Sequence, residues 1–212
     1  MTRRTAIKLL VGVAALGVIG WLFIASLGRT NRSPYHIDAA ALSSWTLIAG
    51  DGSEPGVVSL QAPPAIAGDL FKQVFQRTMQ SLTAPPRPAI PLVLQGEYAD
   101  SLQGVMSVDN IMQIARAAGV HEARFDPVCV GVFRRTESGR THELHVALLS
   151  SATFDEFRQR LAPAFPEHAG TAPFNPSAVR PLLPIASTDR SVASWWPLDM
   201  TADDCEAPIE AE

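Results

Sequence analysis

The sequence predicts an α+β protein: one apolar helix near the N-terminus, a linker, and a single folded domain. An uncharged run covers residues 9–27, and segments with helix-like or strand-like periodicity follow from residue 45 onward. From residue 92 these segments occur in the order strand, helix, strand, strand, helix, strand. This β-α-β-β-α-β order is typical of the ferredoxin-like fold, in which two helices cover one face of an antiparallel sheet.

The composition limits the number of domains and the classes of partner. The chain has 212 residues, of which 47% are hydrophobic and 18% are charged, enough for one domain with a core and an appendage. There are 17 Lys and Arg against 21 Asp and Glu, so the formal net charge is -4. A nucleic-acid partner is not expected, because such proteins carry an excess of basic residues.

The uncharged run begins at Leu9 and ends at Leu27. As a helix rising about 1.5 Å per residue it would extend roughly 28 Å, which is close to the thickness of the hydrocarbon core of a bilayer. The run therefore predicts a transmembrane anchor, with the membrane as a partner. A cleaved secretory signal peptide is the alternative, although the apolar region of such peptides is usually shorter, about 7 to 15 residues.

Positive charges flank this run on both sides, with a modest excess before it. They are Arg3, Arg4 and Lys8 on one side, and Arg29 and Arg32 on the other. Because cytoplasmic flanks of membrane helices are enriched in Lys and Arg, residues 1–8 are expected in the cytoplasm. This orientation predicts a single-pass protein of the inner membrane of a bacterial envelope, with its C-terminal domain in the periplasm.

Residues 2–8, Thr-Arg-Arg-Thr-Ala-Ile-Lys, resemble the twin-arginine export signal of bacteria. The peptide departs from that pattern at Ala6, where Phe is preferred. The resemblance implies export of a folded protein, or of one bound to a folded partner. The alternative is that both arginines are only the positive flank of an anchor.

Residues 28–44 are polar and predict a juxtamembrane linker. In the next region, residues 45–91, two short strands at 45–49 and 57–60 surround a Gly-rich turn, which indicates a hairpin. Apolar side chains recur with helical spacing over 66–82, which predicts an amphipathic helix. Four prolines in 83–91 predict a stiff connector that is neither helix nor central strand.

The predicted α+β core covers residues 92–190. Ser107 is suited to cap a helix that ends before Gly119, and the prolines near residue 184 place the last strand at a sheet edge. The expected elements are strands at 92–98, 128–136, 141–150 and 179–187 and helices at 107–118 and 152–162.

The tail, residues 191–212, combines aromatic residues with an acidic end. Trp195, Trp196 and Leu198 are candidates for partner binding, because Trp is enriched at interface hot spots. The alternative is that the two tryptophans close the open face of the domain, with the acidic end in solvent.

The two cysteines, Cys129 and Cys205, predict a disulfide in an oxidising compartment. Such a loop would add about 4 to 5 kcal/mol of stability in the loop-entropy model. Two unlinked, buried thiols are the alternative.

No catalytic, cofactor-binding or metal-binding residue is assigned from the sequence, and a non-enzyme is favoured. There is no nucleophile elbow, phosphate loop or Cys-x-x-Cys motif. His142 and His145 are close in sequence, but residues three apart in a strand point to opposite faces.

These observations favour a non-catalytic, membrane-anchored envelope protein that is an accessory or assembly subunit of a larger membrane protein complex. The alternative is an extracytoplasmic binding module that holds a small apolar or peptide ligand on the open face of the sheet or in a cleft beneath Trp195 and Trp196. A redox or enzyme subunit exported by the twin-arginine route is a third hypothesis.

Overall fold

The computed structural model describes residues 17, 18, 20, 21, 33–52, 54–164, 175–189 and 191–212. No helix among these residues is long and apolar enough to cross a membrane. This finding corrects the transmembrane anchor predicted for residues 9–27 and the single-pass inner-membrane localisation that depended on it. Most of residues 9–27 lie outside the described residues.

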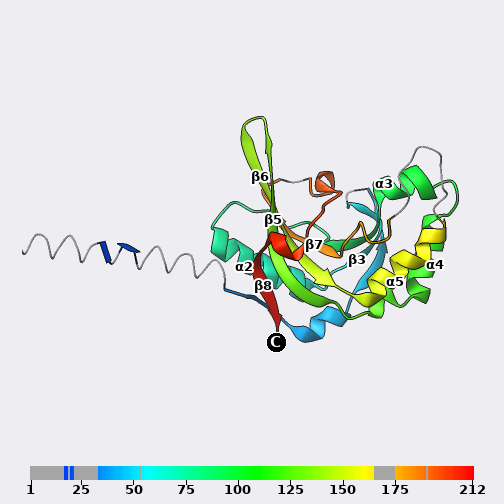
Figure 1. Ribbon diagram of the computed structural model, residues 1–212, viewed down its shortest axis with the longest axis horizontal. Coiled ribbons are helices and arrows are strands. Elements are labelled where there is room, and N and C mark those ends of the chain that lie inside the picture. Colours follow the sequence, from blue (N-terminus) through cyan, green and yellow to red (C-terminus); the bar gives the residue numbers. More distant parts are fainter. Residues whose placement is uncertain (1–16, 19, 22–32, 53, 165–174, 190) are drawn as a thin grey trace, which may run out of the picture. The chain divides into compact units, whose positions relative to one another are not determined.

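Residues 34–212 form one compact unit with two β-sheets (Figure 1). A five-stranded sheet has the order β1-β8-β5-β6-β7, in which β1 and β8 are parallel and the other pairs antiparallel. Its strands are β1 (Tyr35–Ile37), β5 (Asp126–Glu137), β6 (Arg140–Ser150), β7 (Leu182–Ser187) and β8 (Cys205–Ala211). An antiparallel three-stranded sheet contains β2 (Thr46–Ala49), β3 (Gly56–Gln61) and β4 (Ala89–Leu94).

The longest described helix, α2 (Pro64–Thr78), contacts both β1 and β7, the two outer strands of the five-stranded sheet. The sheet therefore curls around this helix, and Leu70 and Val74 of its apolar side are fully buried. The other described helices are α3 (Gln95–Glu97), α4 (Val108–Ala117), which contacts β2 and β3, and α5 (Ala152–Leu161). Single turns complete the chain: η1 (Ala39–Ser43), η2 (Tyr98–Leu102), η3 (Val120–Glu122), η4 (Ala162–Ala164), η5 (Ala193–Trp195) and η6 (Ala202–Asp204).

The fold is α+β, but the predicted ferredoxin-like order is wrong. That fold requires the strand predicted at 92–98 to pair within the sheet of the later strands, whereas β4 pairs with β3 in a separate sheet. The five-stranded sheet is instead completed by β1 and β8. Periodicity reports that a strand exists and which face it buries, but the choice of a pairing partner is set by packing.

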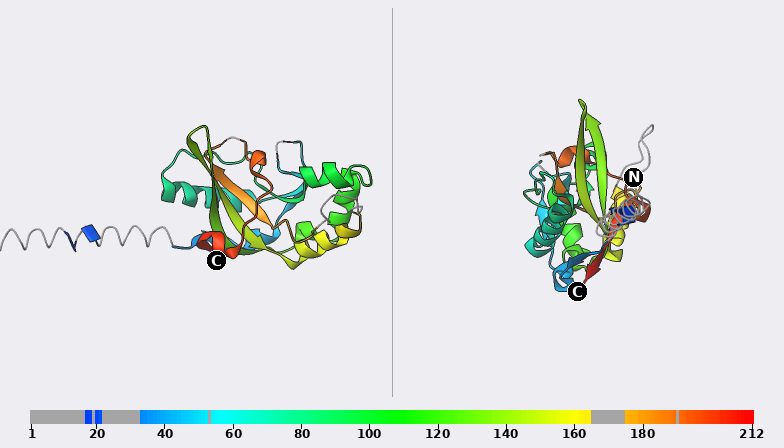
Figure 2. Two further views of the ribbon diagram at one scale, coloured as in Figure 1. Left: turned by 45° about the horizontal axis from the view of Figure 1, so that its top comes forward. Right: turned by 90° about the vertical axis from the view of Figure 1, so that its left-hand side faces the viewer.

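The hairpin predicted before the amphipathic helix is present as β2 and β3. The Pro-rich connector is shorter than predicted, because β4 begins at Ala89 and includes Pro91. Both β4 and β7, which includes Pro184, are edge strands, where the missing N–H of proline is tolerated. Figure 2 shows the β5–β6 hairpin extending beyond the rest of the sheet.

Two segments that were interpreted as linker and solvated tail belong to the core. Tyr35, Ile37 and Leu42 are buried, so residues 34–44 are part of the folded unit and not a linker. In β8, the side chains of Ala207 and Ile209 are buried, while Pro208 between them and Glu206 and Glu210 on either side are exposed. The strand lies between β1 and β5, so the acidic end is a sheet strand with one polar face.

Candidate ligand-binding site

A pocket of about 640 Å³ opens on the folded unit, between the turn that follows β4 and the segment around Trp196. Its lining comes from four separate segments of the chain, so only the tertiary fold assembles it. The lining residues are Gly52, Glu54, Pro55, Leu94, Gln95, Gly96, Glu97, Asp100, Ala178, Val179, Ala193, Ser194, Trp196 and Pro197.

A buried ion pair fixes the wall formed by the turn after β4. The side chain of Arg158 in α5 has 0% exposure and holds Glu97 with two parallel bonds. Nη1 lies 2.9 Å from Oε2 of Glu97, and Nη2 lies 2.7 Å from Oε1. Arg158 also donates to the carbonyls of Leu92 and Pro176, each at 3.2 Å. Such a bidentate pair fixes the orientation of the carboxylate as well as its position.

Glu97 stabilises this wall internally, and Gln95 connects it to the β2–β3 turn. Oε2 of Glu97 accepts the backbone N–H of Leu94 at 3.0 Å, which holds the end of β4. The backbone N–H of Gln95 donates to the carbonyl of Pro55 at 3.0 Å, and its side-chain amide donates to the carbonyl of Glu54 at 3.0 Å. Two loops that are about 40 residues apart in the chain therefore form one wall.

Glu54 is the second acidic residue of this wall and is 5% exposed. Its Oε1 lies 2.6 Å from Nε of Arg87, and its Oε2 accepts the backbone N–H of Asp51 at 3.2 Å. Arg87 also forms an ion pair with the carboxylate of Asp51. The guanidinium of Arg87 thus pairs with two carboxylates, of which that of Glu54 belongs to a lining residue.

The opposite wall is formed by Trp196 and Pro197, which follow the single turn η5. Beneath them the ring of Trp195 is buried, with the guanidinium of Arg135 4.3 Å from its centroid. Arg135 also forms an ion pair with Asp189 at 2.5 Å. Further along the chain, Cys205 at the start of β8 forms a disulfide with Cys129 in β5, and their Cα atoms lie 5.7 Å apart.

The three candidates for partner binding have different positions in the structure. Trp196 lines the pocket, whereas Trp195 packs in a small apolar cluster with Val192 and Met200. Leu198 is half-buried against the same cluster and does not line the pocket. A role of these three residues in partner binding stays a prediction.

Glu54, Glu97 and Arg158 were not expected as site residues from the sequence. Glu97 and Arg158 are 61 residues apart, and neither belongs to a motif. The only local signal is Arg158 itself, which falls among the apolar residues Phe154, Phe157 and Leu161 of α5, all fully buried. A charged residue on a buried helix face requires a partner, although the sequence does not name it.

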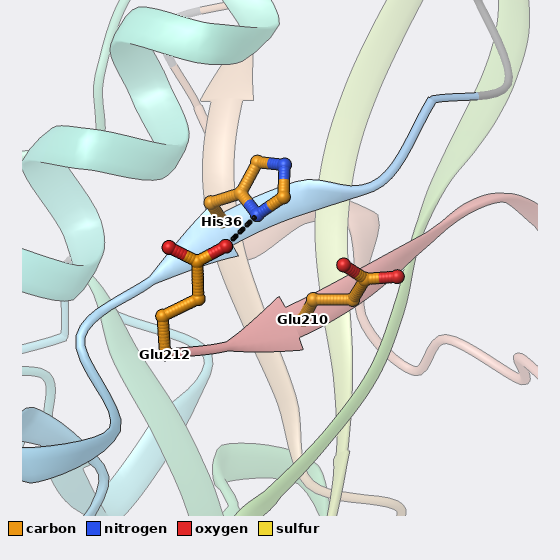
Figure 3. A group of neighbouring side chains, drawn as sticks. All are labelled: His36, Glu210 and Glu212. Carbon is orange, nitrogen blue, oxygen red and sulfur yellow. Dashed lines mark ion pairs between the residues drawn. The ribbon is translucent and has the colours of Figure 1, made fainter.

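A second group of side chains that could hold a metal ion lies on β1 and β8 and is drawn in Figure 3. It consists of His36, Glu210 and Glu212, whose donor atoms lie within 4.8 Å of one another. The parallel register places His36 opposite Glu210, and Nδ1 of His36 lies 3.0 Å from Oε1 of Glu212. All three side chains are exposed, and this ion pair accounts for their closeness, so we assign no metal to them.

Among its described residues, the lining includes no pair of nucleophile and general base. Its hydroxyl group belongs to Ser194, which donates to the carbonyl of Ser191 at 2.8 Å. Among the described residues, the buried histidine is His145 in β6, which lies outside the lining and whose pKa is lowered by burial. The pocket therefore presents apolar surface, an indole ring and carboxylate acceptors.

Comparisons with known proteins identify no relative. No family model matches the chain, and no curated protein or solved structure is significantly similar to it.

Proposed function

We propose that this chain is a non-catalytic binding protein whose pocket holds an apolar group of a ligand against Trp196. The observation that supports this proposal is the pocket itself, because its volume of about 640 Å³ lies within the usual range of ligand sites. The ligand is either a free small molecule or a segment of another protein. In the second case the chain acts as an accessory or assembly subunit of a complex.

The way in which the walls are held favours binding over a chance surface depression. Arg158 and Glu97 fix one wall by four hydrogen bonds from a fully buried guanidinium. The other wall is anchored by the buried ring of Trp195. A pocket that keeps its shape without ligand loses less conformational entropy when the ligand binds.

The proposal can be tested by nuclear magnetic resonance on the full chain. Indole, and separately a library of short peptides that contain Trp, Phe or Leu, would be added to ¹⁵N-labelled protein. We expect shifts of the backbone signals of Gly96 and Ala193 and of the indole N–H of Trp196, all from lining residues. Binding of indole alone would indicate a small molecule, whereas much tighter binding of one peptide would indicate a partner protein.

Two variants make this test specific. Trp196→Ala removes the aromatic wall and is expected to weaken binding at least about tenfold. Phe75→Ala is the matched control, because Phe75 is 44% exposed on α2 and does not line the pocket. The proposal is wrong if no probe shifts the lining signals, or if Trp196→Ala binds as tightly as Phe75→Ala.

A further inference from the structure

The lining of the pocket has an uneven distribution of charge. Three of its residues are acidic, Glu54, Glu97 and Asp100, and none of its described members is Lys, Arg or His. The guanidiniums of Arg87 and Arg158 lie behind the lining and are already paired, and Arg135, which donates to the lining residue Ser194, is paired with Asp189.

The three carboxylates differ in how they are compensated. Glu97 is matched by Arg158 with two parallel bonds. Glu54 shares Arg87 with Asp51. Asp100, in the turn η2, forms no ion pair with any residue in the described part of the chain. Four carboxylates in and behind the wall therefore face two guanidiniums, which leaves the pocket with an excess of negative charge.

The opposite wall strengthens the same preference. Trp196 lines the pocket, and a cation placed over the face of an indole ring is attracted by its quadrupole. A cleft that combines one sign of charge with apolar walls also concentrates ligands of the opposite sign. An anionic ligand would instead lose hydration next to Asp100 with no cation in the described lining to compensate it.

We infer that the ligand carries a positive charge beside its apolar group, as an alkylammonium or a guanidinium. The apolar group packs on Trp196 and Pro197, and the cation lies near Asp100. This inference rests on the proposed function. The same chemistry is found in a free aromatic or aliphatic amine and in a Lys or Arg side chain next to an apolar residue of a partner protein.

Three probes that share a phenyl ring and differ in charge test the inference on the full chain. They are phenethylamine, which is a cation, phenethyl alcohol, which is neutral, and phenylacetate, which is an anion. We expect the amine to bind at least about tenfold more tightly than the alcohol, and the acid to bind most weakly. Raising the salt concentration should reduce the advantage of the amine and leave the alcohol unchanged.

Asp100→Asn assigns the preference to one carboxylate. It should weaken binding of the amine by about three- to tenfold and leave the affinity for the alcohol unchanged. Asp109→Asn is the matched control, because it removes the same charge from an exposed position of α4 outside the lining. Acetylated peptides with Phe-Lys and with Phe-norleucine extend the test to a protein partner, and a Phe-Lys peptide that binds more tightly than phenethylamine would indicate that source.

The outcomes separate this inference from the proposed function. If amine and alcohol bind equally, or if the acid binds most tightly, the inferred cation is wrong while the pocket remains a binding site. If both Asp variants reduce amine binding to the same extent, the role of Asp100 is overturned. If none of the probes shifts the lining signals, the proposed function itself fails.

Discussion

The wall of the pocket that follows β4 is held by a buried ion pair, whereas the wall that carries Trp196 is held by a buried indole and a disulfide at its far end. The first wall is built from regular elements, β4, α3 and α5, that fix Glu97 and Arg158. The second is a segment between β7 and β8 whose described part contains only single turns. Breaking the ion pair of the first wall should therefore cost mainly global stability, whereas opening the disulfide of the second wall should in addition loosen that wall locally.

The largest effect is expected from Arg158→Met. This change leaves the carboxylate of Glu97 with no cation and frees two carbonyls that Arg158 satisfies. Removing one partner of a fully buried pair costs about 3 to 5 kcal/mol of unfolding free energy, and we expect the lower end of this range because Glu97 is 19% exposed. Chemical denaturation followed by circular dichroism would measure it.

Arg160→Met is the matched control for this change. Arg160 lies in the same helix and pairs with Glu156 at 3.8 Å, but both side chains are more than half exposed. Such pairs contribute about 0.3 to 0.5 kcal/mol. Similar losses in both variants would show that the Arg158–Glu97 pair does not fix the first wall.

The second effect concerns the disulfide. The double variant Cys129→Ala/Cys205→Ala opens a loop with a sequence separation of 76, and a loss of about 2 to 5 kcal/mol is expected. Because Cys205 ends the segment that carries Trp196, hydrogen exchange at residues 193–196 should accelerate more than exchange at residues 95–97. Equal acceleration in both segments would contradict the difference between the two walls.

Local signals in the sequence were sufficient for the helices α4 and α5 but not for the first wall itself, because the strand predicted at 92–98 ends at Leu94 and residues 95–97 form α3. Ser107 caps α4 by accepting the N–H of Asn110 at 3.2 Å, and Gly119 after the helix has φ 69°, both as their residue types indicate. The partnership of Glu97 with Arg158 and the separation of β4 from the five-stranded sheet depend on contacts across many residues. No short window of sequence contains that information.

The second wall was recognised by composition alone. Trp196 was identified because Trp is common in binding sites, but the division of roles between Trp195 and Trp196 depends on which side of the segment faces the sheet. Strand β8 was not predicted, because acidic residues dominate the composition of this segment. They obscure the alternation of buried and exposed positions that Ala207 and Ile209 form with Glu206 and Glu210. Acidic residues on the solvent face of a strand are compatible with a sheet that is open to water on one side.

A third prediction concerns β6, whose residues Leu144 and Val146 pack in the apolar cluster beneath the second wall. Between them His145 is buried, and burial lowers its pKa from 6.5, although the carboxylate of Glu143 opposes the shift. The unfolded chain therefore takes up a proton near pH 6.5 while the folded chain does not. Stability should be constant above that pH and fall as the pH decreases toward the lowered pKa, by at most about 1.4 kcal/mol per pH unit for one proton.

His145→Leu should remove this contribution to the pH dependence. Neither ring nitrogen of His145 has a hydrogen-bond partner in the described residues, so an apolar replacement leaves no new unpaired group behind. His142→Leu, at a partly exposed position of the same strand, serves as the control. Denaturation curves between pH 5 and pH 8 that keep the same slope in His145→Leu would show that another group is responsible.

The smallest effect is expected at the exposed pair of His36 and Glu212, which offers the contrast to Arg158 and Glu97. The distance of 3.0 Å between Nδ1 and Oε1 is similar to the distances in the buried pair, but the side chains are 49% and 76% exposed. Water solvates both groups when the pair is broken, so Glu212→Gln should change the unfolding free energy by less than about 1 kcal/mol. The backbone of Glu212 remains held by its hydrogen bonds to Ile37 and Ala39, at 3.0 and 2.9 Å. Thermal denaturation that shows a loss of unfolding free energy as large as that of Arg158→Met would contradict this expectation. Burial would then not explain why the first wall depends on its ion pair.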